Sequence, residues 1–392
     1  MEHQYRLWAE INRNHLMHNL EQIKKLVKAS GLDRLIMAVV KADAYGHGVI
    51  ETARTLVSGG VNRLAVSNLD EALQLRHNGF QLPIQILSYT FTSGVEEIVR
   101  HNLIQTVYDV ELAAAISTQA LKSGTQCRIH IKIDTGMTRL GMPDTEEAIR
   151  QIETIHKMPN ILIEGLMTHF ATADTDDTTT GKQFRRFMNF YRKLEQKGIH
   201  IPIRHVANSA AVMRFPHMHL EMIRPGIMLY GLYPGEAMKA SGIVLKSVMS
   251  LKAKVIKTNL VPAKVAVSYG GRFVTERASR LVTIPAGYAD GYSRTLSGQS
   301  RIILKGHCIP IVGNICMDHF MADATDIEED ISVGDEIVIL GENGKHHISA
   351  DELATFLGTI NYELVCRIGM RVPRVYTEDG DVRNSVSYIS QL

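Results

Sequence analysis

Lys41 stands at the end of an apolar run, AVVK, and is followed by the segment ADAYGHG. A lysine at the carboxyl end of a buried strand is partly removed from water, which lowers the pKa of its amine. The neutral amine is the nucleophile that forms a Schiff base with a carbonyl compound. Most lysines at strand ends are structural or solvated, so position alone leaves both a Schiff-base role and a structural role open.

Four other side chains could contribute to chemistry, and each has an ordinary structural interpretation. His169 follows the apolar run LIEGLMT, where a lone histidine is more often a satisfied core group than a catalyst. Arg224 precedes a Pro-Gly pair and could equally be a surface arginine or one that pairs with phosphate. Ser209 could be a helix N-cap, and Tyr269 could be a core tyrosine of a β domain.

The first 230 or so residues alternate short apolar runs with helical patterns. Asn68 with Glu71, and Asp144 with Glu147, predict capping boxes at the starts of two helices. Further helices are predicted over 12–29 and 181–197, and the polar stretch 172–180 is predicted to be a loop that caps the second of them. Eight apolar runs are typical of buried parallel strands: 35–41, 64–67, 84–88, 104–108, 127–134, 162–169, 203–208 and 223–230.

Eight β/α repeats predict an α/β fold with an N-terminal (β/α)8 barrel, whose active face lies at the carboxyl ends of the strands. After about residue 242, short β-type runs alternate with Gly, Pro, Asn and Asp turns, and only DELATFLG has a helical pattern. The prediction is therefore a barrel over 1–242 and a mostly β domain over 243–392. The first ten or so residues could join the second domain.

Composition and charge argue against several classes of protein. The chain has 392 residues with 45% hydrophobic and 21% charged, which is ordinary for a globular protein, and its net charge is only +2. Neither a nucleic-acid partner nor a membrane span is expected, because there is no basic block and no long apolar run. The N-terminus lacks the apolar region of a signal peptide. The four cysteines are widely spaced, so we expect thiols in a reducing cytoplasm and no metal site.

The segment AVVKADAYGHG strongly resembles the cofactor-lysine motif of alanine racemases, fold-type III enzymes that use pyridoxal 5′-phosphate. The resemblance continues along nearly the whole chain in family order. Its other motifs are KIDTGMTRLG (132–141), LMTHFATAD (166–174), HVANSA (205–210), IRPGIMLYG (223–231), VSYG (267–270), GYADGYSR (287–294), VGNICMD (312–318) and RVPR (371–374). Each alone could be coincidental, whereas their joint order and spacing are very specific.

The resemblance implies a set of residues that bind the cofactor. Lys41 is implied as the residue that holds it covalently, and Arg224 as the residue that faces the pyridine nitrogen. An arginine there keeps that nitrogen largely unprotonated, because it does not give up its own proton. His169 is implied to pack against the ring and tune it. The resemblance assigns the phosphate to Tyr45, Ser209 and the backbone amides near Gly226 and Ile227, and implies Asn208 as a further cofactor-binding residue. Small residues and free N–H groups at a strand-to-helix turn suit a phosphate dianion.

Racemisation needs a base on each face of the α-carbon. The resemblance assigns these roles to Lys41 and Tyr269. An unperturbed tyrosine has a pKa of about 10, so Tyr269 would need cationic neighbours. Arg139 and the backbone amide of Met317 are implied to hold the substrate carboxylate, and Tyr288 to line the site entrance.

Four residues complete the predicted site. Lys132 matches a lysine that is often carbamylated in the family, although an ordinary pair of Lys132 with Asp134 is equally open. Cys316 is expected to pack rather than react, and Asp318 belongs to the same ICMD segment. Met370 departs from the family, which usually has a tyrosine there that bonds the phosphate and crowds the substrate methyl.

The resemblance predicts a cytoplasmic, homodimeric racemase with shared active sites that interconverts L- and D-alanine, the latter a bacterial cell-wall precursor. A racemase for serine or a broader set of amino acids is the nearest alternative, because Met370 cannot make the tyrosine's contacts. A decarboxylase of the same fold type is disfavoured, since neither its catalytic cysteine motif nor its Gly-rich phosphate loop is found. A non-catalytic cofactor-binding protein would end near the barrel, whereas this chain continues through a β domain.

Overall fold

The computed structural model of this chain describes residues 5–29, 31 and 33–389, which form two compact units. The first, called here the barrel unit, contains Met17–Ala44 and Val49–Lys246. The second, called the β unit, contains the described residues up to Leu16, Tyr45–Gly48 and the chain from Ser247 onward. The chain leaves the barrel unit after Lys246, and the short segment Tyr45–Gly48 joins the β unit.

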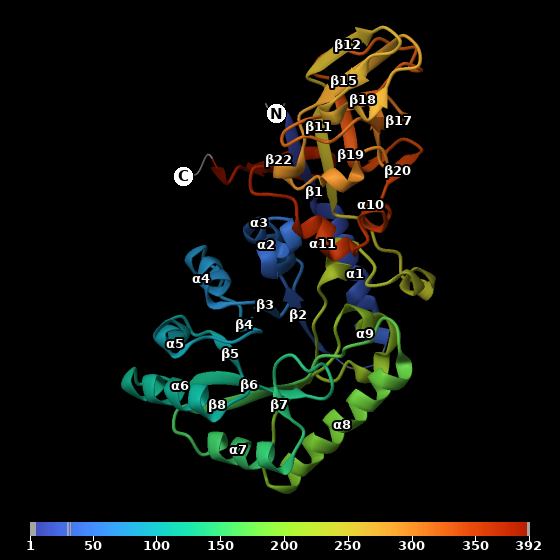
Figure 1. Cartoon of the computed structure of the whole chain (residues 1–392). Helices are drawn as coiled ribbons and strands as arrows, with labels where there is room; N and C mark the ends of the chain where they lie inside the picture. Colours follow the sequence, from blue (N-terminus) through green and yellow to red (C-terminus); the bar gives the residue numbers. More distant parts are fainter. Residues whose placement is uncertain (1–4, 30, 32, 390–392) are drawn as a thin grey trace. The chain divides into compact units, whose positions relative to one another are not determined.

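Parallel strands form the centre of the barrel unit (Figure 1). Their order in the sheet is β10-β2-β3-β4-β5-β6-β8-β9, and a hydrogen bond of 2.9 Å from Arg224 N to Ala207 O links its two ends. The predicted α/β barrel is therefore confirmed. The strands are β2 (Leu35–Val39), β3 (Arg63–Val66), β4 (Ile84–Ile86), β5 (Ile104–Val107), β6 (Cys127–Asp134), β8 (Ile161–Met167), β9 (Ile203–His205) and β10 (Met222–Ile223), with β7 (Met142–Pro143) beside β6.

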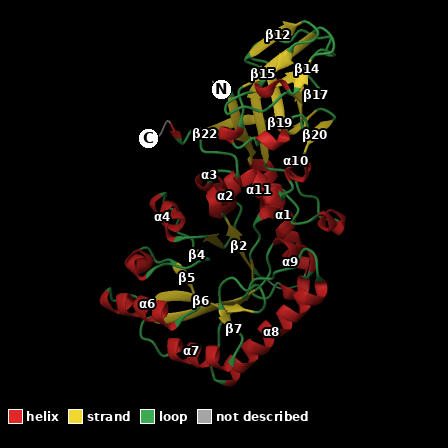
Figure 2. Cartoon of the chain, viewed as in Figure 1, coloured by secondary structure: helices red, strands yellow, loops and turns green. Residues whose placement is uncertain are grey.

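Helices connect these strands and cover their outer side (Figure 2). Because such crossovers bury both faces of a parallel sheet, most residues of its strands are buried, including polar ones such as Gln85, His130 and His205. The helices are α1 (Arg13–Ala29), α2 (Lys41–Gly46), α3 (Val49–Ser58), α4 (Leu69–His77), α5 (Val95–Arg100), α6 (Val110–Lys122), α7 (Glu146–His156), α8 (Asp177–Gln196) and α9 (Ser209–Arg214). None of the helices in the described part of the chain has the length and apolar character needed to cross a bilayer.

Local capping patterns were predicted with mixed success. Asn68 caps α4 as expected, accepting from Glu71 N at 3.0 Å. The Asp144 cap was wrong: Thr145 caps α7 by accepting from Ala148 N, and Asp144 instead pairs with Arg186. Asp144 and Thr145 are adjacent, and the sequence pattern fits either residue as the N-cap of α7. Only their tertiary contacts distinguish the two possibilities.

Two predicted elements differ in extent. The run 223–230 is not a continuous strand, because β10 ends at Ile223 and a 3-10 turn, η3 (Ile227–Tyr230), follows. The intervening Pro225 lacks the N–H that a sheet ladder needs, so the strand stops before it. The long helix α8 begins at Asp177 rather than 181, because Asp176 caps it by accepting from Thr179 N at 3.1 Å.

The β unit is built on one long sheet in the order β12-β15-β18-β17-β16-β19-β11-β1-β21-β22. β1 pairs antiparallel with β11 and parallel with β21, so the start of the chain belongs to this sheet. The bounds are β1 (Leu7–Asn12), β11 (Met249–Lys254), β12 (Lys257–Val261), β13 (Ala266–Val267), β14 (Phe273–Val274), β15 (Ser279–Ile284), β16 (Arg301–Leu304), β17 (His307–Val312), β18 (Phe320–Asp323), β19 (Glu336–Asn343), β20 (His346–Ile348), β21 (Arg374–Glu378) and β22 (Asp381–Val386).

Two α-helices follow strand β20 in the β unit, within the residues that the structure describes. The predicted one is α10 (Ala350–Leu357), which begins after the cap Ser349 and ends at Gly358. The second, α11 (Asn361–Cys366), was not predicted, because its six residues are too few for a helical period to stand out.

The turn that follows Lys41 has left-handed backbone geometry. Ala42, Asp43, Ala44 and Tyr45 have φ values of 53°, 53°, 54° and 55°, so α2 is a left-handed helix. Each such residue costs roughly 1–2 kcal/mol when it carries a Cβ. Hydrogen bonds hold the turn in place: Ala42 N donates to Glu71 at 2.7 Å and Val49 N donates to Asp43 at 2.7 Å. Strain of this kind persists mainly at functional sites.

Replacing Ala42, which is exposed, with glycine should stabilise the protein. Glycine removes the left-handed penalty but gains freedom in the unfolded chain, so we expect a net increase of about 0.5–1 kcal/mol in the free energy of unfolding. The control is Ala114→Gly in the right-handed helix α6, which should lower that free energy by about 1 kcal/mol. Urea unfolding at constant m-value measures both variants, and equal signs would contradict the assignment of strain to this turn.

Candidate active site

Five predicted site residues of the barrel unit follow or end parallel strands at their carboxyl side. Lys41 lies two residues after β2, Lys132 is inside β6 and is only 4% exposed, and Arg224 comes directly after β10. Arg139 lies in the loop after β6, and His169 lies two residues after β8. The barrel places these side chains at the face where (β/α)8 enzymes carry their active sites. We call this group the barrel half-site.

Positive charge accumulates in the barrel half-site. Burial, followed by repulsion from Arg139 and Arg224, lowers the pKa of Lys132 to about 8, and Lys41 acts in the same direction. Asp134 is the carboxylate that opposes this shift. A cluster in which Arg139, Arg224 and Lys41 all repel a charged Lys132 favours an anionic ligand, such as a phosphate or a carboxylate.

Arg224 is buried and hydrogen-bonded to neutral acceptors. Its guanidinium donates to the carbonyls of His205 at 2.6 Å, Thr168 at 2.8 Å and Val206 at 3.2 Å. It also contacts the Nδ1 atoms of the His205 ring at 3.1 Å and the His169 ring at 3.4 Å. Burial lowers the pKa of Arg224 to about 9, so at neutral pH the side chain is a charged donor.

His169 is an uncharged ring next to this guanidinium. Burial, with repulsion from Arg224 and Arg139, holds the pKa of His169 well below its ordinary value. Because arginine has only donors, the Nδ1 of His169 that faces Arg224 must accept, and the ring proton lies on Nε2. A neutral ring with this tautomer can pack against a planar ligand without adding charge.

Two short helical turns converge on Ser209, the first residue of α9. Its hydroxyl accepts from Gly226 N at 2.9 Å and lies 3.5 Å from Met228 N. Asn208 caps α9 by accepting from Ala211 N at 3.0 Å, and the amide of Ile227 opens η3. Ser209, Gly226 and Ile227 are all buried. Backbone amides and a hydroxyl gathered in this way form a suitable cradle for a phosphate.

The loop that carries Arg139 is closed by Asp134. Although partial burial opposes it, hydrogen bonds from the amides of Gly136, Thr138 and Met137 hold the pKa of Asp134 below its usual range. The three N···Oδ1 distances lie between 2.8 and 3.1 Å. This turn fixes the path of the chain from the buried Lys132 to the exposed Arg139.

Three of the remaining predicted residues, Tyr269, Tyr288 and Cys316, line a cavity of about 430 Å³ in the β unit. Together with the predicted residues Met317, Asp318 and Met370, they are called here the β half-site. Tyr269 is 75% exposed, and Asn314 Nδ2 donates to its backbone carbonyl at 2.5 Å. Tyr288 N donates to Cys316 O at 3.1 Å, which joins the GYADG turn to the ICMD segment. The residues that line the cavity are Tyr269, Tyr288, Arg294, Ile315 and Cys316.

Arg371 connects the two loops of the β half-site. It pairs with Asp318 at 2.8 Å and with Asp290 at 3.4 Å. Its neighbour Met370 is 68% exposed, and Met317 is 52% exposed. The predicted side chains of this half-site therefore have solvent-facing surfaces within a single chain.

Tyr45 belongs to the β unit together with residues 46–48. Its ring lies 6.3 Å from that of Tyr362 in α11. Arg374 Nε donates to Gly46 O at 3.0 Å. A Cβ on Gly46 would lie 2.4 Å from Val365 O, so only glycine permits this approach.

Comparisons with known proteins agree with the motifs. The family model described as alanine racemase, N-terminal domain, matches residues 11–234, and that of the C-terminal domain matches 248–376. The chain belongs to the alanine racemase family. It is similar to the alanine racemase of Clostridium tetani, with 46% identity and 98% of each chain covered.

Solved structures show the same fold. A structure of the alanine racemase of Clostridium difficile 630 has a TM-score of 0.94 and 40% identity, covering 99% of this chain and all of its own. A histidine racemase from Leuconostoc mesenteroides has a TM-score of 0.86 and 27% identity, covering 96% of this chain and 99% of its own. The architecture shared by these racemases thus accompanies more than one named substrate.

Sequence reasoning about the alanine racemase motifs missed several residues that the structure places beside the predicted ones. Asn314 holds the Tyr269 backbone, and Arg371 joins the Asp290 and Asp318 loops. Both lie inside family motifs, VGNICMD and RVPR, so the sequence indicated that they belong to the site. It did not indicate which residues they contact. His205 of HVANSA was likewise quoted without a role, yet its ring contacts Arg224.

Replacing Lys132 with methionine should stabilise the cofactor-free protein. The folded-state pKa of about 8 lies below the ordinary 10.5, so folding disfavours the charged lysine. The cost is full below pH 8, on the order of 3 kcal/mol, and fades as pH rises from about 8 to 10.5. We expect Lys132→Met to raise the free energy of unfolding by that order at pH 7, measured in carbonate-free buffer, with the advantage shrinking in alkali.

The control is Lys252→Met in the β unit. Lys252 lies 2.9 Å from Glu10 and 3.4 Å from Glu336. Although burial opposes it, these carboxylates raise the pKa of Lys252, so its removal should destabilise the protein. If Lys132→Met also destabilised the protein at pH 7, the cost of burying a charged lysine beside other cations would not be the dominant effect.

Proposed function

We propose that this chain interconverts L- and D-alanine with pyridoxal 5′-phosphate as its cofactor. Family membership and identity of 46% over nearly the full length of a curated alanine racemase support the reaction. The observation that carries the proposal is the barrel half-site, in which Lys41, Arg139 and Arg224 all act electrostatically on Lys132, and Arg224 lies two residues before Gly226 of the buried amide cradle. A cytoplasmic location stays a prediction from the family resemblance.

The residues of the barrel half-site fit this cofactor. Its phosphate would be held by Ser209 and the amides of Gly226 and Ile227, with Tyr45 as a further hydrogen-bond donor. Arg224 would face the pyridine nitrogen and His169 the ring. When bound, pyridoxal phosphate withdraws electrons from the α-carbon of the amino acid, which makes its hydrogen acidic.

The chain's own residues would hold and move the proton. Lys41 would bind the cofactor covalently and act as the base on one face of the α-carbon, and Tyr269 would act as the base on the other. Arg139 and the amide of Met317 would orient the substrate carboxylate. Tyr288 lines the cavity beside Tyr269, where it would limit entry.

Carbamylation of Lys132 fits its surroundings. With a pKa of about 8, an appreciable share of its amine is neutral near pH 8 and can add carbon dioxide. The resulting anion would attract Arg139 instead of repelling it. This change would orient Arg139 for the substrate and relieve the repulsion that Arg139 and Arg224 impose on a charged lysine.

A homodimer with shared active sites would complete the site. Tyr269 and Met317 have exposed fractions of 75% and 52% within one chain, which is unusual for a base and a binding residue that need a dry site. We propose that the β half-site of one subunit meets the barrel half-site of the other.

Purified protein incubated with L-alanine and pyridoxal phosphate should yield both enantiomers. The holoenzyme should also absorb in the near-visible, lose that band on borohydride reduction, and carry the reduced adduct on Lys41. Chiral chromatography and peptide mapping measure the two results. A cofactor band without any conversion would favour a non-catalytic binding protein, and an adduct on another lysine would contradict the role of Lys41.

Mixing two inactive variants should restore activity if sites are shared. In a heterodimer of Lys41→Ala and Tyr269→Phe, one site has both residues intact and the other has neither. Random exchange of equal amounts makes half of the dimers heterodimers, so we expect about a quarter of wild-type activity. The control is each variant alone. If labelled subunits exchange and no activity returns, both bases come from one chain.

Serine or a broader range of amino acids is the alternative substrate set. A histidine racemase shares the fold, so the architecture itself does not select alanine. Met370 replaces the tyrosine usual in the family, and a flexible, exposed methionine offers neither a hydrogen bond nor a rigid wall. We propose that alanine remains the best substrate and that serine is turned over measurably but more slowly.

Met370→Tyr should raise the alanine-to-serine ratio of kcat/KM by roughly tenfold, because pocket contacts of this size discriminate within about a hundredfold. It should also slow loss of the cofactor, since a bond to the phosphate would be added. Met370→Phe is the matched control: it adds the ring without the hydroxyl, so it should change selectivity but not cofactor retention. An unchanged ratio in both variants would show that position 370 does not set selectivity.

A further inference from the structure

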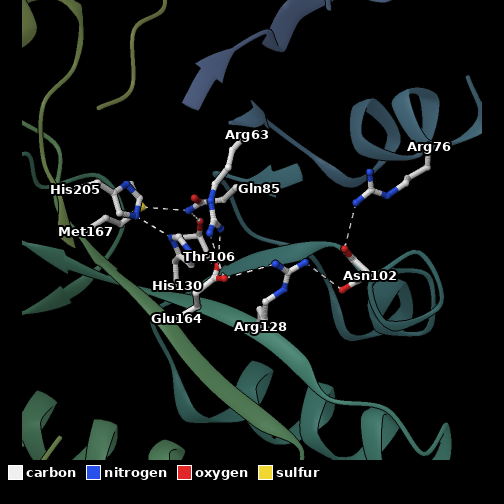
Figure 3. A network of polar contacts seen from close by, with 10 residues as sticks. All are labelled: Arg63, Arg76, Gln85, Asn102, Thr106, Arg128, His130, Glu164, Met167 and His205. Atoms are coloured by element: carbon white, nitrogen blue, oxygen red, sulfur yellow. Dashed lines mark hydrogen bonds and ion pairs between the residues drawn. The ribbon is translucent and has the colours of Figure 1, made fainter. Parts of the chain in front are cut away.

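A chain of buried polar side chains runs from Arg224 through the interior of the barrel unit. His205 Nδ1 contacts Arg224 at 3.1 Å, and His205 Nε2 contacts His130 Nδ1 at 2.7 Å. His130 Nε2 in turn contacts Glu164 Oε2 at 3.1 Å. Both histidine rings are fully buried. Figure 3 shows the two rings pointing toward one another from β9 and β6, with Glu164 of β8 at the far end.

Because arginine can only donate hydrogen bonds, Arg224 determines which nitrogen carries the proton on each of the two histidine rings. Arg224 is a donor only, so the Nδ1 of His205 must be a lone pair, and the proton that every neutral imidazole keeps must lie on Nε2. That N–H donates to His130, whose Nδ1 must therefore accept, which leaves the His130 proton on Nε2. The final acceptor is Glu164, which must present a bare oxygen to His130 Nε2.

Glu164 is held in that state from its other side. Arg63 contacts its two oxygens, one of them at 3.2 Å, and Arg128 lies 3.5 Å away. Although burial opposes it, the bonds from His130 and Arg63 hold the pKa of Glu164 well below its usual range. Arg224, which can only donate, and Glu164, which can only accept, therefore impose the same hydrogen-bond direction on both rings: Nδ1 accepts and Nε2 donates.

Neither histidine can take up a second proton without breaking a contact. A proton on His205 Nδ1 would face the guanidinium of Arg224. A proton on His130 Nδ1 would face the N–H of His205. Burial and the charge of Arg63 lower the pKa of both rings, Arg128 acts in the same direction on His130 and Arg224 on His205, and the Glu164 carboxylate opposes the shift at His130.

We propose that Glu164 and His130 are positioning residues that act through His205 to orient Arg224, by presenting it with a lone pair of fixed direction. Their contribution to racemisation rests on the proposed function of Arg224 at the pyridine nitrogen. We call the hydrogen-bonded series Glu164–His130–His205–Arg224 the relay. The other contacts of Arg224 are with neutral acceptors. Through the relay, a remote carboxylate therefore fixes the orientation of the guanidinium without neutralising its charge. Glu164, His130 and His205 bear no other role in the proposed reaction.

The first test reads the rings in the wild-type holoenzyme without substrate. Nitrogen NMR of protein labelled in its histidines, assigned with His130→Phe and His205→Phe, should show both rings neutral with the proton on Nε2. Neither should titrate between about pH 6 and 8, where an ordinary histidine does. A ring protonated on Nδ1, or a charged ring at pH 7, would overturn the relay.

The second test separates the relay from general stability. Glu164→Gln keeps an acceptor oxygen and should retain both tautomers and most activity. Glu164→Leu should alter the His205 signals, shift the cofactor absorbance and lower kcat on the order of tenfold with little change in KM. Combined with Arg224→Lys, Glu164→Leu should add no further loss, because its effect is exerted through Arg224.

The matched control is Glu221→Leu, which removes a carboxylate bonded to Arg204 on the neighbouring strand and leaves the relay intact. It should leave the His205 signals, the absorbance and kcat unchanged. Equal losses in Glu221→Leu and Glu164→Leu, or additive losses with Arg224→Lys, would overturn the positioning role. If Glu164→Leu does not fold, the wild-type ring states and Glu164→Gln decide. A wild-type protein without racemase activity would contradict the proposed function, whereas the ring states would still decide the relay.

Discussion

Repulsion between like charges is the constraint on which the barrel half-site depends. Lys132 lies inside a strand at 4% exposure, and burial, followed by repulsion from Arg139, Arg224 and Lys41, lowers its pKa. Such a cluster is unfavourable in the empty protein and favourable once an anion enters it. A ligand that carries a phosphate and a carboxylate should relieve this repulsion. We therefore expect binding of the cofactor and substrate to increase the free energy of unfolding.

The barrel supports this repulsion because its strands are fixed by their neighbours. Arg224 follows a two-residue strand, yet its amide closes the sheet and its guanidinium reaches three carbonyls and two rings. Lys41 is followed by four left-handed residues that Glu71 and Asp43 tie down. At Arg224 the cation is positioned by carbonyls and neutral rings, so its charge stays available to a ligand.

The sequence predicted the barrel, the second domain and the family because these depend on patterns that repeat or that span the chain. Residue roles implied by the resemblance, such as those of Lys41 and Tyr269, stay predictions. The left-handed turn could not be predicted, because ADAY contains no glycine and its geometry follows from contacts that Asp43 and Tyr45 make elsewhere. The Thr145 cap and the short helix α11 were missed because their local signals are weaker than their tertiary contacts.

The relay was beyond sequence reasoning for a different physical reason. His130, Glu164 and His205 are spread over three strands, and a lone histidine in a buried strand is usually a satisfied core group. Only the sheet order, which places β6 beside β8 and β8 beside β9, brings them into one line. Because arginine cannot accept a hydrogen bond, the direction of that line then follows from Arg224 alone. The conventional interpretation as satisfied core groups and the functional one are thus compatible: the bonds that satisfy these rings are the same bonds that orient Arg224.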